Sequence, residues 1–210
     1  MDINFDKYLI LDKFNVSRET FPILEQLKNI VIDKNEEINL VSSNTIDNFV
    51  ERHIIDSAQI IDFIDLNSNI CTDLGTGGGF PGVVIAILLR DKKCKIKMNL
   101  YEKSYHKSKF LRDVSEKLKL DTLILDKDVF KQGNLISGSI LARAFKPLPT
   151  ILELVEKNFK KYTNLILFMG KNGKQMLDET IKQWEFEYKI KESLTSNDSF
   201  LISIKNIKRK

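Results

Sequence analysis

The sequence predicts an α/β protein with a seven-stranded, mostly parallel sheet, an antiparallel last strand and an N-terminal helical cap. Short apolar segments alternate with helical patterns from residue 70 onwards, and glycines follow the first of these segments. Strands that alternate with helices form a parallel sheet covered on both faces. Two strand-like segments joined by a turn close the chain, and such a hairpin brings in a strand of opposite direction.

The first third of the chain is expected to be helical. Ser17 is a candidate N-cap for a helix whose apolar residues recur three or four positions apart as far as Val31. A second helical pattern covers Thr45–Ile64. These patterns predict a helical cap over residues 1–66, packed on the same unit as the main domain over residues 67–210.

The main domain is expected to alternate strands and helices. Strands are predicted at residues 70–74, 97–101, 122–125, 138–144 and 165–169, and helices at 81–90, 104–118, 150–159 and 175–184. The closing hairpin comprises residues 185–191 and 199–205, around the turn-forming Ser196, Asn197 and Asp198. A parallel sheet that ends in a hairpin differs from the usual dinucleotide-binding fold.

Composition limits the class of protein. With 42% hydrophobic and 30% charged residues, the 210-residue chain has an ordinary globular composition. Its longest uncharged apolar run, Gly77–Leu89, is shorter than the ~20 residues that cross a bilayer. Cys71 and Cys94 have no disulfide or metal-ligand spacing, and the amino terminus lacks the pattern of a secretory signal. We therefore expect a cytoplasmic protein without metal or membrane partner, and a monomer by default.

The charge is unevenly distributed. Residues 1–56 hold 6 Lys/Arg against 11 Asp/Glu, whereas residues 57–210 hold 27 against 18. A basic body of this kind suits a polyanionic partner such as RNA. The alternative is that lysine, which outnumbers arginine, only covers solvated faces.

The segment ICTDLGTGGGFPG carries the strongest local pattern. Gly75, Gly77 and Gly79 follow a predicted strand and precede a predicted helix, where glycines let the backbone approach a ligand. Read from Gly75, the pattern is typical of S-adenosylmethionine sites. Read from Gly77 to Gly82, it matches the dinucleotide fingerprint. Glu102, at the end of the second strand, suits both cofactors because its carboxylate can accept both hydroxyls of a ribose.

Three observations favour S-adenosylmethionine. Asp73 lies two residues before Gly75, where a carboxylate can face the positively charged methionine end of the cofactor. The dinucleotide register starts two residues late relative to the strand, and the antiparallel tail is typical of methyltransferases. A dinucleotide site and a glycine turn used only for packing remain as alternatives.

Other strand ends supply further candidates, because ligands of such sheets bind outside the carboxyl ends of the strands. Phe80 and Phe130 could pack on an adenine ring or belong to the core. Asp128 and its neighbours could pair with the adenine edge. Arg143 at a strand end is costly to bury without an anionic partner.

The end of the fourth predicted strand lacks two sequence features that some methyltransferases use to activate their target. It has no Asn/Asp-Pro-Pro-aromatic segment for an exocyclic amine and no cysteine nucleophile for pyrimidine C5; it reads LARAFKPLP. A target that is already nucleophilic, such as guanine N7, needs neither. Catalysis would then be mainly alignment of the reacting atoms, without a general base.

The chain resembles the RsmG family (glucose-inhibited division protein B), bacterial 16S rRNA guanine-N7 methyltransferases of the Rossmann-like class I fold. The matching segments lie in the family's order and cover most of residues 38–170. They are INLVS (38–42), ERHIIDS (51–57), DLGTGGGFPG (73–82), KSKFL (107–111), LKL (118–120) and LARAF (141–145).

The resemblance implies a set of site residues and a substrate. The substrate would be a decoding-region loop of 16S rRNA, in free form or in the small ribosomal subunit. His53 and Arg143 are assigned to positioning, not to proton transfer. S-adenosylmethionine contacts are expected at Gly75, Phe80, Glu102, Val129, Phe130 and Arg143, and substrate contacts at Asn39, Arg52, His53, Asp56 and Ser57.

The chain departs from the family at some positions. The family's Lys-Gly pair after the fifth strand is Met169-Gly170 here, and Lys171 follows as a candidate substrate contact. The Arg-x-Glu near the adenine is Asp128-Val129-Phe130. Two alternatives to the methyltransferase stay open: a nicotinamide-dependent reductase, for which no Tyr-x-x-x-Lys pair is found, and a non-catalytic rRNA-binding assembly factor.

Overall fold

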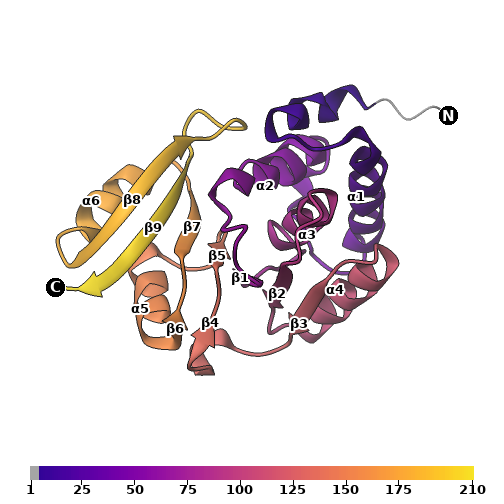
Figure 1. Ribbon diagram of the computed structural model, residues 1–210. Coiled ribbons are helices and arrows are strands. Elements are labelled where there is room, and N and C mark those ends of the chain that lie inside the picture. The colour runs from indigo at the N-terminus through magenta and orange to yellow at the C-terminus, as the bar shows by residue number, and fades with distance from the viewer. Residues whose placement is uncertain (1–4) are drawn as a thin grey trace.

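The computed structural model describes residues 5–210 and is centred on one twisted sheet (Figure 1). Its strands lie in the order β3-β2-β1-β5-β7-β9-β8, and only the pairs that β9 makes are antiparallel. The expected fold is confirmed, with the antiparallel strand between two others. The seven strands are β1 (Ile70–Leu74), β2 (Lys97–Tyr101), β3 (Thr122–Leu125), β5 (Ser139–Ala142), β7 (Asn164–Met169), β8 (Trp184–Glu192) and β9 (Phe200–Arg209).

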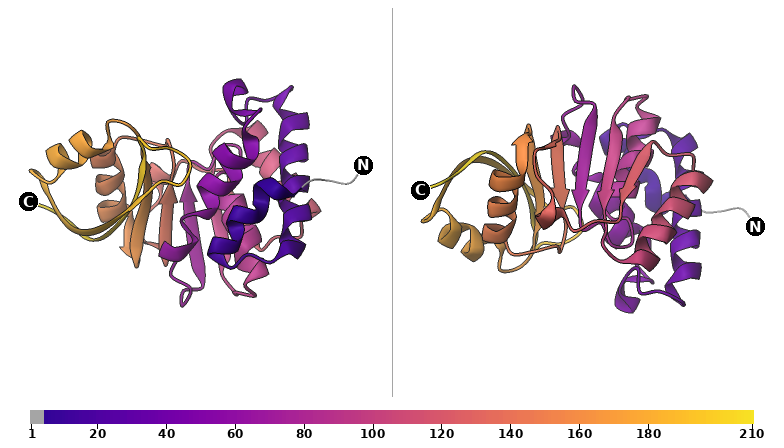
Figure 2. Two further views of the ribbon diagram at one scale, coloured as in Figure 1. Left: turned by 90° about the horizontal axis from the view of Figure 1, so that it is seen from above. Right: turned by 90° about the horizontal axis from the view of Figure 1, so that it is seen from below.

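Helices cover both faces of the sheet (Figures 1 and 2). On one face lie α1 (Phe21–Asn35), α3 (Gly82–Asp91) and α4 (Tyr105–Lys117), and on the other α5 (Leu148–Asn158) and α6 (Gly173–Thr180). Residues Gly82–Leu89 of α3 are all buried, because the sheet covers one side of this helix and the N-terminal helices cover the other. This explains why α3 is apolar on every side.

The cap is helical, but outside α1 it consists mostly of 3-10 and π segments. Short 3-10 segments form η1 (Asp6–Phe14), η2 (Arg18–Thr20), η3 (Ser43–Thr45) and η5 (Ile61–Phe63), while η4 (Val50–Ile55) is a π-helix that continues into α2 (Asp56–Ala58). The expected N-cap role of Ser17 is wrong. Its side chain caps neither η2 nor α1 and hydrogen-bonds Asp91 at the end of α3 instead.

Two details of the main domain also differ from expectation. The predicted helix at 175–184 ends at Thr180, because Trp184 is buried in the sheet, where it pairs with Arg209 of β9. A separate two-stranded sheet joins β4 (Leu135–Ile136) to β6 (Phe159–Lys161), which the prediction missed. Strands of two and three residues are too short to produce a sequence pattern.

The cap and the sheet share one apolar core. A single cluster extends from Tyr8 and Leu24 in the cap through Ile85 of α3 to Met98 of the sheet. Within residues 5–210, no helix has the length and apolar character to cross a membrane. The core therefore fixes the cap directly above the carboxyl ends of β1 and β5, where the candidate site lies.

Candidate cofactor and substrate site

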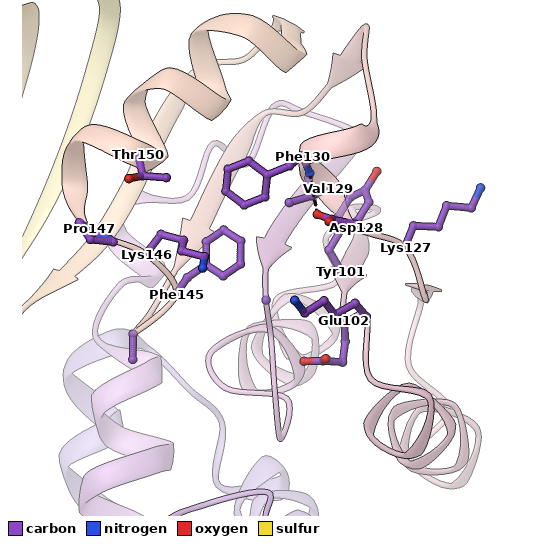
Figure 3. Close-up of a pocket in the computed structure, with 13 residues that line it drawn as sticks. Tyr101, Glu102, Lys127, Asp128, Val129, Phe130, Phe145, Lys146, Pro147 and Thr150 are labelled. Carbon is purple, nitrogen blue, oxygen red and sulfur yellow. Dashed lines mark hydrogen bonds between the residues drawn. The ribbon is translucent and has the colours of Figure 1, made fainter.

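A cavity of about 700 Å³ opens at the carboxyl ends of β1, β2, β3 and β5 (Figure 3). It combines backbone from the glycine loop, an acidic residue after β2, aromatic rings and several lysines. The lining residues are Gly75, Tyr101, Glu102, Lys103, Lys127, Asp128, Val129, Phe130, Ala144, Phe145, Lys146, Pro147 and Thr150.

Half of the predicted cofactor residues line this cavity, and the other half lie behind or beside it. The first group consists of Gly75, Glu102, Asp128, Val129 and Phe130. The second group consists of Asp73, Gly77, Gly79, Phe80 and Arg143, none of which is among the lining residues.

The glycine loop is held in a conformation that favours glycine. Gly75, Gly77 and Gly79 have φ values of +65°, +58° and +97°. A Cβ on Gly75 would lie 2.2 Å from Cδ2 of Phe145, so the aromatic ring packs directly on this backbone. Glu102 supports the loop from the next strand, because its Oε2 accepts a hydrogen bond from the Gly77 N–H at 3.0 Å.

Asp73 fixes the loop from below and keeps one oxygen free. Its Oδ2 accepts hydrogen bonds from the Thr76 hydroxyl at 2.6 Å and from the Gly82 N–H at 2.9 Å. Its Oδ1 is buried and has no hydrogen-bond partner among the described residues. Complete burial raises the pKa of Asp73 to about 6, against the lowering effect of these hydrogen bonds. A buried carboxylate with a spare oxygen is suited to a cationic ligand group.

Aromatic rings form one side of the cavity (Figure 3). Phe130 is 40% exposed and stacks on Phe145, with 5.9 Å between ring centroids and 26° between planes. The Asp128 carboxylate accepts a hydrogen bond from the Phe130 N–H and so fixes the turn that carries this ring. Phe145 was not predicted as a cofactor residue, although it belongs to the predicted strand-end segment Arg143-Ala144-Phe145.

Phe80 belongs to the contact between the loop and the cap. Its buried ring lies 5.6 Å from the Phe49 ring and 5.0 Å from the His53 ring. His53 Nε2 lies 2.7 Å from the Thr45 hydroxyl. Burial, together with the charges of Arg143 and Arg52, lowers the pKa of His53 to about 4. This imidazole is therefore neutral at physiological pH.

Arg143 finds its anionic partner within the protein. Its Nη2 lies 3.1 Å from Asp56 Oδ2 and donates a hydrogen bond to the Arg52 carbonyl at 2.8 Å. Its buried Nη1 has no partner among the described residues. Burial lowers the pKa of the guanidinium, and Asp56 opposes this effect. Like Asp73, Arg143 thus has one buried polar atom without a hydrogen-bond partner among the described residues.

The remaining substrate candidates have different positions. Ser57 is fully buried and donates its hydroxyl to the His53 carbonyl, which places it inside the cap. Arg52 is exposed and reaches the Thr195 carbonyl at 3.4 Å. Asn39 is exposed and lines neither of the two cavities described here. Lys171 lines a second cavity of about 440 Å³ beside the first.

Comparison with known proteins identifies the family. The family model described as "rRNA small subunit methyltransferase G" matches residues 21–201. The chain belongs to this family. It is 52% identical, over the full length of both chains, to "Ribosomal RNA small subunit methyltransferase G" of Pelagibacter ubique. It is 35% identical to the protein of the same name from Rickettsia akari, over 91% of this chain and 97% of that one.

Solved structures of methyltransferases share the fold. A SAM-dependent O-methyltransferase from Thermotoga maritima superimposes with a TM-score of 0.53 at 16% identity, over 79% of this chain and 71% of that one. The 16S rRNA methylase RmtB superimposes with a TM-score of 0.52 at 13% identity, over 93% of this chain and 76% of that one. Family and fold together confirm an S-adenosylmethionine-dependent methyltransferase and decide against the nicotinamide-dependent reductase.

Proposed function

We propose that this protein transfers a methyl group from S-adenosylmethionine to N7 of a guanine in a decoding-region loop of 16S rRNA. The observation that carries the proposal is the unpartnered Asp73 Oδ1, buried beside a glycine loop at the end of β1. The names of the relatives support an rRNA substrate, and the family resemblance supports guanine N7.

The residues present fit this cofactor. Asp73 Oδ1 can accept a hydrogen bond from its ammonium group, and Arg143 Nη1 can donate one to its carboxylate. Glu102 accepts one backbone N–H on each oxygen, at 3.0 Å from Gly77 and 2.7 Å from Ser104, so each oxygen keeps a lone pair for a ribose hydroxyl. Phe130 offers an exposed aromatic face for adenine, which stacking on an aromatic side chain stabilises by about 1–3 kcal/mol.

The proposed reaction needs no proton transfer before the methyl group moves. The cofactor, when bound, supplies an electrophilic methyl group on a sulfonium. Transfer to N7 would form the N–C bond from the N7 lone pair, break the S–C bond and leave the positive charge on the guanine, so no residue of the chain would need to take up a proton first. Because His53 is buried, neutral and hydrogen-bonded to Thr45, we assign it to positioning of the cap. The protein then acts by alignment, which contributes up to about 7–11 kcal/mol in well-oriented systems.

A nucleoside digest tests the proposal. The purified protein is incubated with methyl-labelled S-adenosylmethionine and with small subunits, or their isolated 16S rRNA, from cells that lack the corresponding gene. We expect the label in 7-methylguanosine. Label in another nucleoside would overturn the N7 assignment, and RNA binding without any turnover would favour the assembly-factor alternative. Comparison of the subunit with the isolated rRNA identifies the form of substrate that the enzyme accepts.

A further inference from the structure

A second cavity adjoins the proposed cofactor cavity at the carboxyl ends of β5 and β7. Its volume is about 440 Å³, and it shares the segment Ala144–Pro147 with the first cavity. Ligands in the two cavities would therefore both contact this segment. That arrangement suits a transfer reaction, in which donor and acceptor atoms must approach to about 3–3.5 Å.

The chemistry of the second cavity suits a nucleotide. Apolar side chains, among them Phe168 and Met176, form its walls. Its two charged lining residues are both lysines, Lys146 on the shared segment and Lys171 after β7. The guanidinium of Arg143 lies over the Phe168 ring, 5.6 Å from its centroid, and fixes this aromatic wall. An apolar pocket with cations at its rim matches a base with flanking phosphates.

Asn172 adds an amide that the fold does not use. It occupies the N-cap position of α6, yet its side chain makes no capping hydrogen bond. Asp128, at the N-cap of the short η6 turn (Val129–Lys131), does cap through its carboxylate. Asparagine is favoured at N-caps because its side chain satisfies backbone N–H groups. The uncapped Asn172 lines the second cavity, so its amide is free to bond the edge of a base.

We infer that the second cavity receives the target guanosine, extruded from the RNA, with Asn172 at the base edge and Lys146 and Lys171 on flanking phosphates. The inference rests on the proposed function and names the acceptor site for it. Enzymes that modify a base bring it out of the stack into a pocket, and about 440 Å³ is within the range of small-ligand pockets. The energy of extrusion is offset by stacking in the pocket and by the phosphate contacts.

The first test fills the cavity. A Cβ on Gly170, which lines the cavity, would meet no atom within 4 Å, so Gly170→Leu adds bulk at the cavity wall without a clash of its Cβ with the fold. We expect wild-type affinity for S-adenosylhomocysteine and at least a hundredfold loss of kcat/KM for rRNA methylation. The matched control is Gly133→Leu, whose Cβ is equally unobstructed but which lies outside both cavities. We expect this variant to behave as wild type.

The second test uses the lysines. We expect Lys146→Gln and Lys171→Gln to weaken rRNA binding and each to reduce the slope of log K against log salt by about 0.7, the value for one phosphate contact on a single strand. The affinity of Lys171→Gln for S-adenosylhomocysteine should not change, because Lys171 does not line the cofactor cavity, and arginine at either position should restore the slope. Lys95→Gln, an exposed lysine just before β2, controls for the loss of one charge.

The outcomes separate the inference from the proposed function. Full methylation by Gly170→Leu, or salt slopes equal to that of Lys95→Gln, would overturn the acceptor site while leaving the proposed function intact. Label from the wild-type enzyme in a nucleoside other than 7-methylguanosine would overturn the proposed function itself. If Gly170→Leu does not fold, as judged by its S-adenosylhomocysteine binding, the salt slopes of the lysine variants still test whether the second cavity is the acceptor site.

Discussion

Asp56 and Arg143 form an ion pair that joins the cap to the end of β5, with 3.1 Å between Oδ2 and Nη2. The other oxygen of Asp56 accepts a hydrogen bond from the Thr195 hydroxyl at 2.7 Å, in the connection between β8 and β9. The Asp56 carboxylate in the cap therefore binds two other parts of the chain that are distant in sequence. Figure 1 shows the β8–β9 connection reaching across to the cap.

The first prediction concerns this ion pair. Asp56→Ala leaves the largely buried Arg143 without its carboxylate, so we expect the free energy of unfolding to fall by about 3 kcal/mol. Urea denaturation of both proteins measures the change. Asp126→Ala serves as the control, because it breaks the exposed pair with Arg112, and its denaturation midpoint should equal that of wild type. Equal losses in the two variants would contradict the role of burial.

The second prediction compares two glycines of the same loop. Gly75→Ala and Gly77→Ala both place a Cβ on a residue with positive φ, which costs about 1–2 kcal/mol. Only the Cβ on Gly75 collides with the Phe145 ring; the nearest atom to a Cβ on Gly77 is 3.9 Å away. We expect Gly75→Ala to weaken S-adenosylhomocysteine binding at least tenfold more than Gly77→Ala does, measured by calorimetry. Equal affinities would show that the Phe145 contact does not shape the cofactor cavity.

The third prediction concerns Asp73 and pH. Its pKa is raised from 3.8 to about 6 by burial, so the folded state retains this proton at pH values where the unfolded state has lost it. The contribution of Asp73 to stability therefore decreases as pH rises from about 4 to 6. Asp73→Asn removes this dependence, and its stability relative to wild type should increase by on the order of 2 kcal/mol between pH 4 and pH 7.

Asp73→Asn should also separate stability from binding. The variant lacks the negative charge that we assign as the partner of the cofactor ammonium group, so we expect weaker binding of S-adenosylhomocysteine at pH 7 in spite of the gain in relative stability. Denaturation curves and calorimetry on the same samples measure both quantities. Unchanged affinity would remove Asp73 Oδ1 from the proposed site.

The fourth prediction concerns His53, whose effect on the pH dependence of stability is opposite to that of Asp73. Its pKa is lowered from 6.5 to about 4, so the unfolded state binds the proton first and wild-type stability falls as pH decreases from 6.5 towards 4. His53→Gln should lack this component of acid sensitivity. Because we assign no proton transfer to His53, we expect kcat at pH 7 to fall less than tenfold. Loss of a general base would lower kcat by about 10²–10⁴-fold.

Much of the sheet was predictable from the sequence. β1, β2 and β3 have the predicted bounds, because short apolar runs between turn residues admit few alternatives. The π-helix Val50–Ile55 was not predictable, because its apolar residues also fit an α-helical spacing. The apolar spacing also predicted that the last helix continues to Trp184. In the structure Trp184 is buried because it belongs to a strand that pairs with β9.

The location of the site was predictable from the sequence, but the contacts of its individual side chains were not. Position at strand ends correctly indicated Gly75, Glu102 and Phe130 as neighbours of one cavity. The same reasoning could not show that Phe80 turns to the cap, because that depends on Phe49 and His53, which lie far away in sequence. For Arg143 it correctly required an anion but could not identify Asp56 as that anion.

The position of β9 between β7 and β8 has a consequence for synthesis of the chain. While the ribosome still holds the residues from Phe200 onwards, β7 has no partner on one side, and Thr195 is not yet held against Asp56. The pairing of β7 with β9 and the hydrogen bond between Thr195 and Asp56 therefore form only after β9 has left the exit tunnel. A nascent chain stalled before Phe200 would expose the edge of β7, a strand whose residues are almost all buried in the finished sheet.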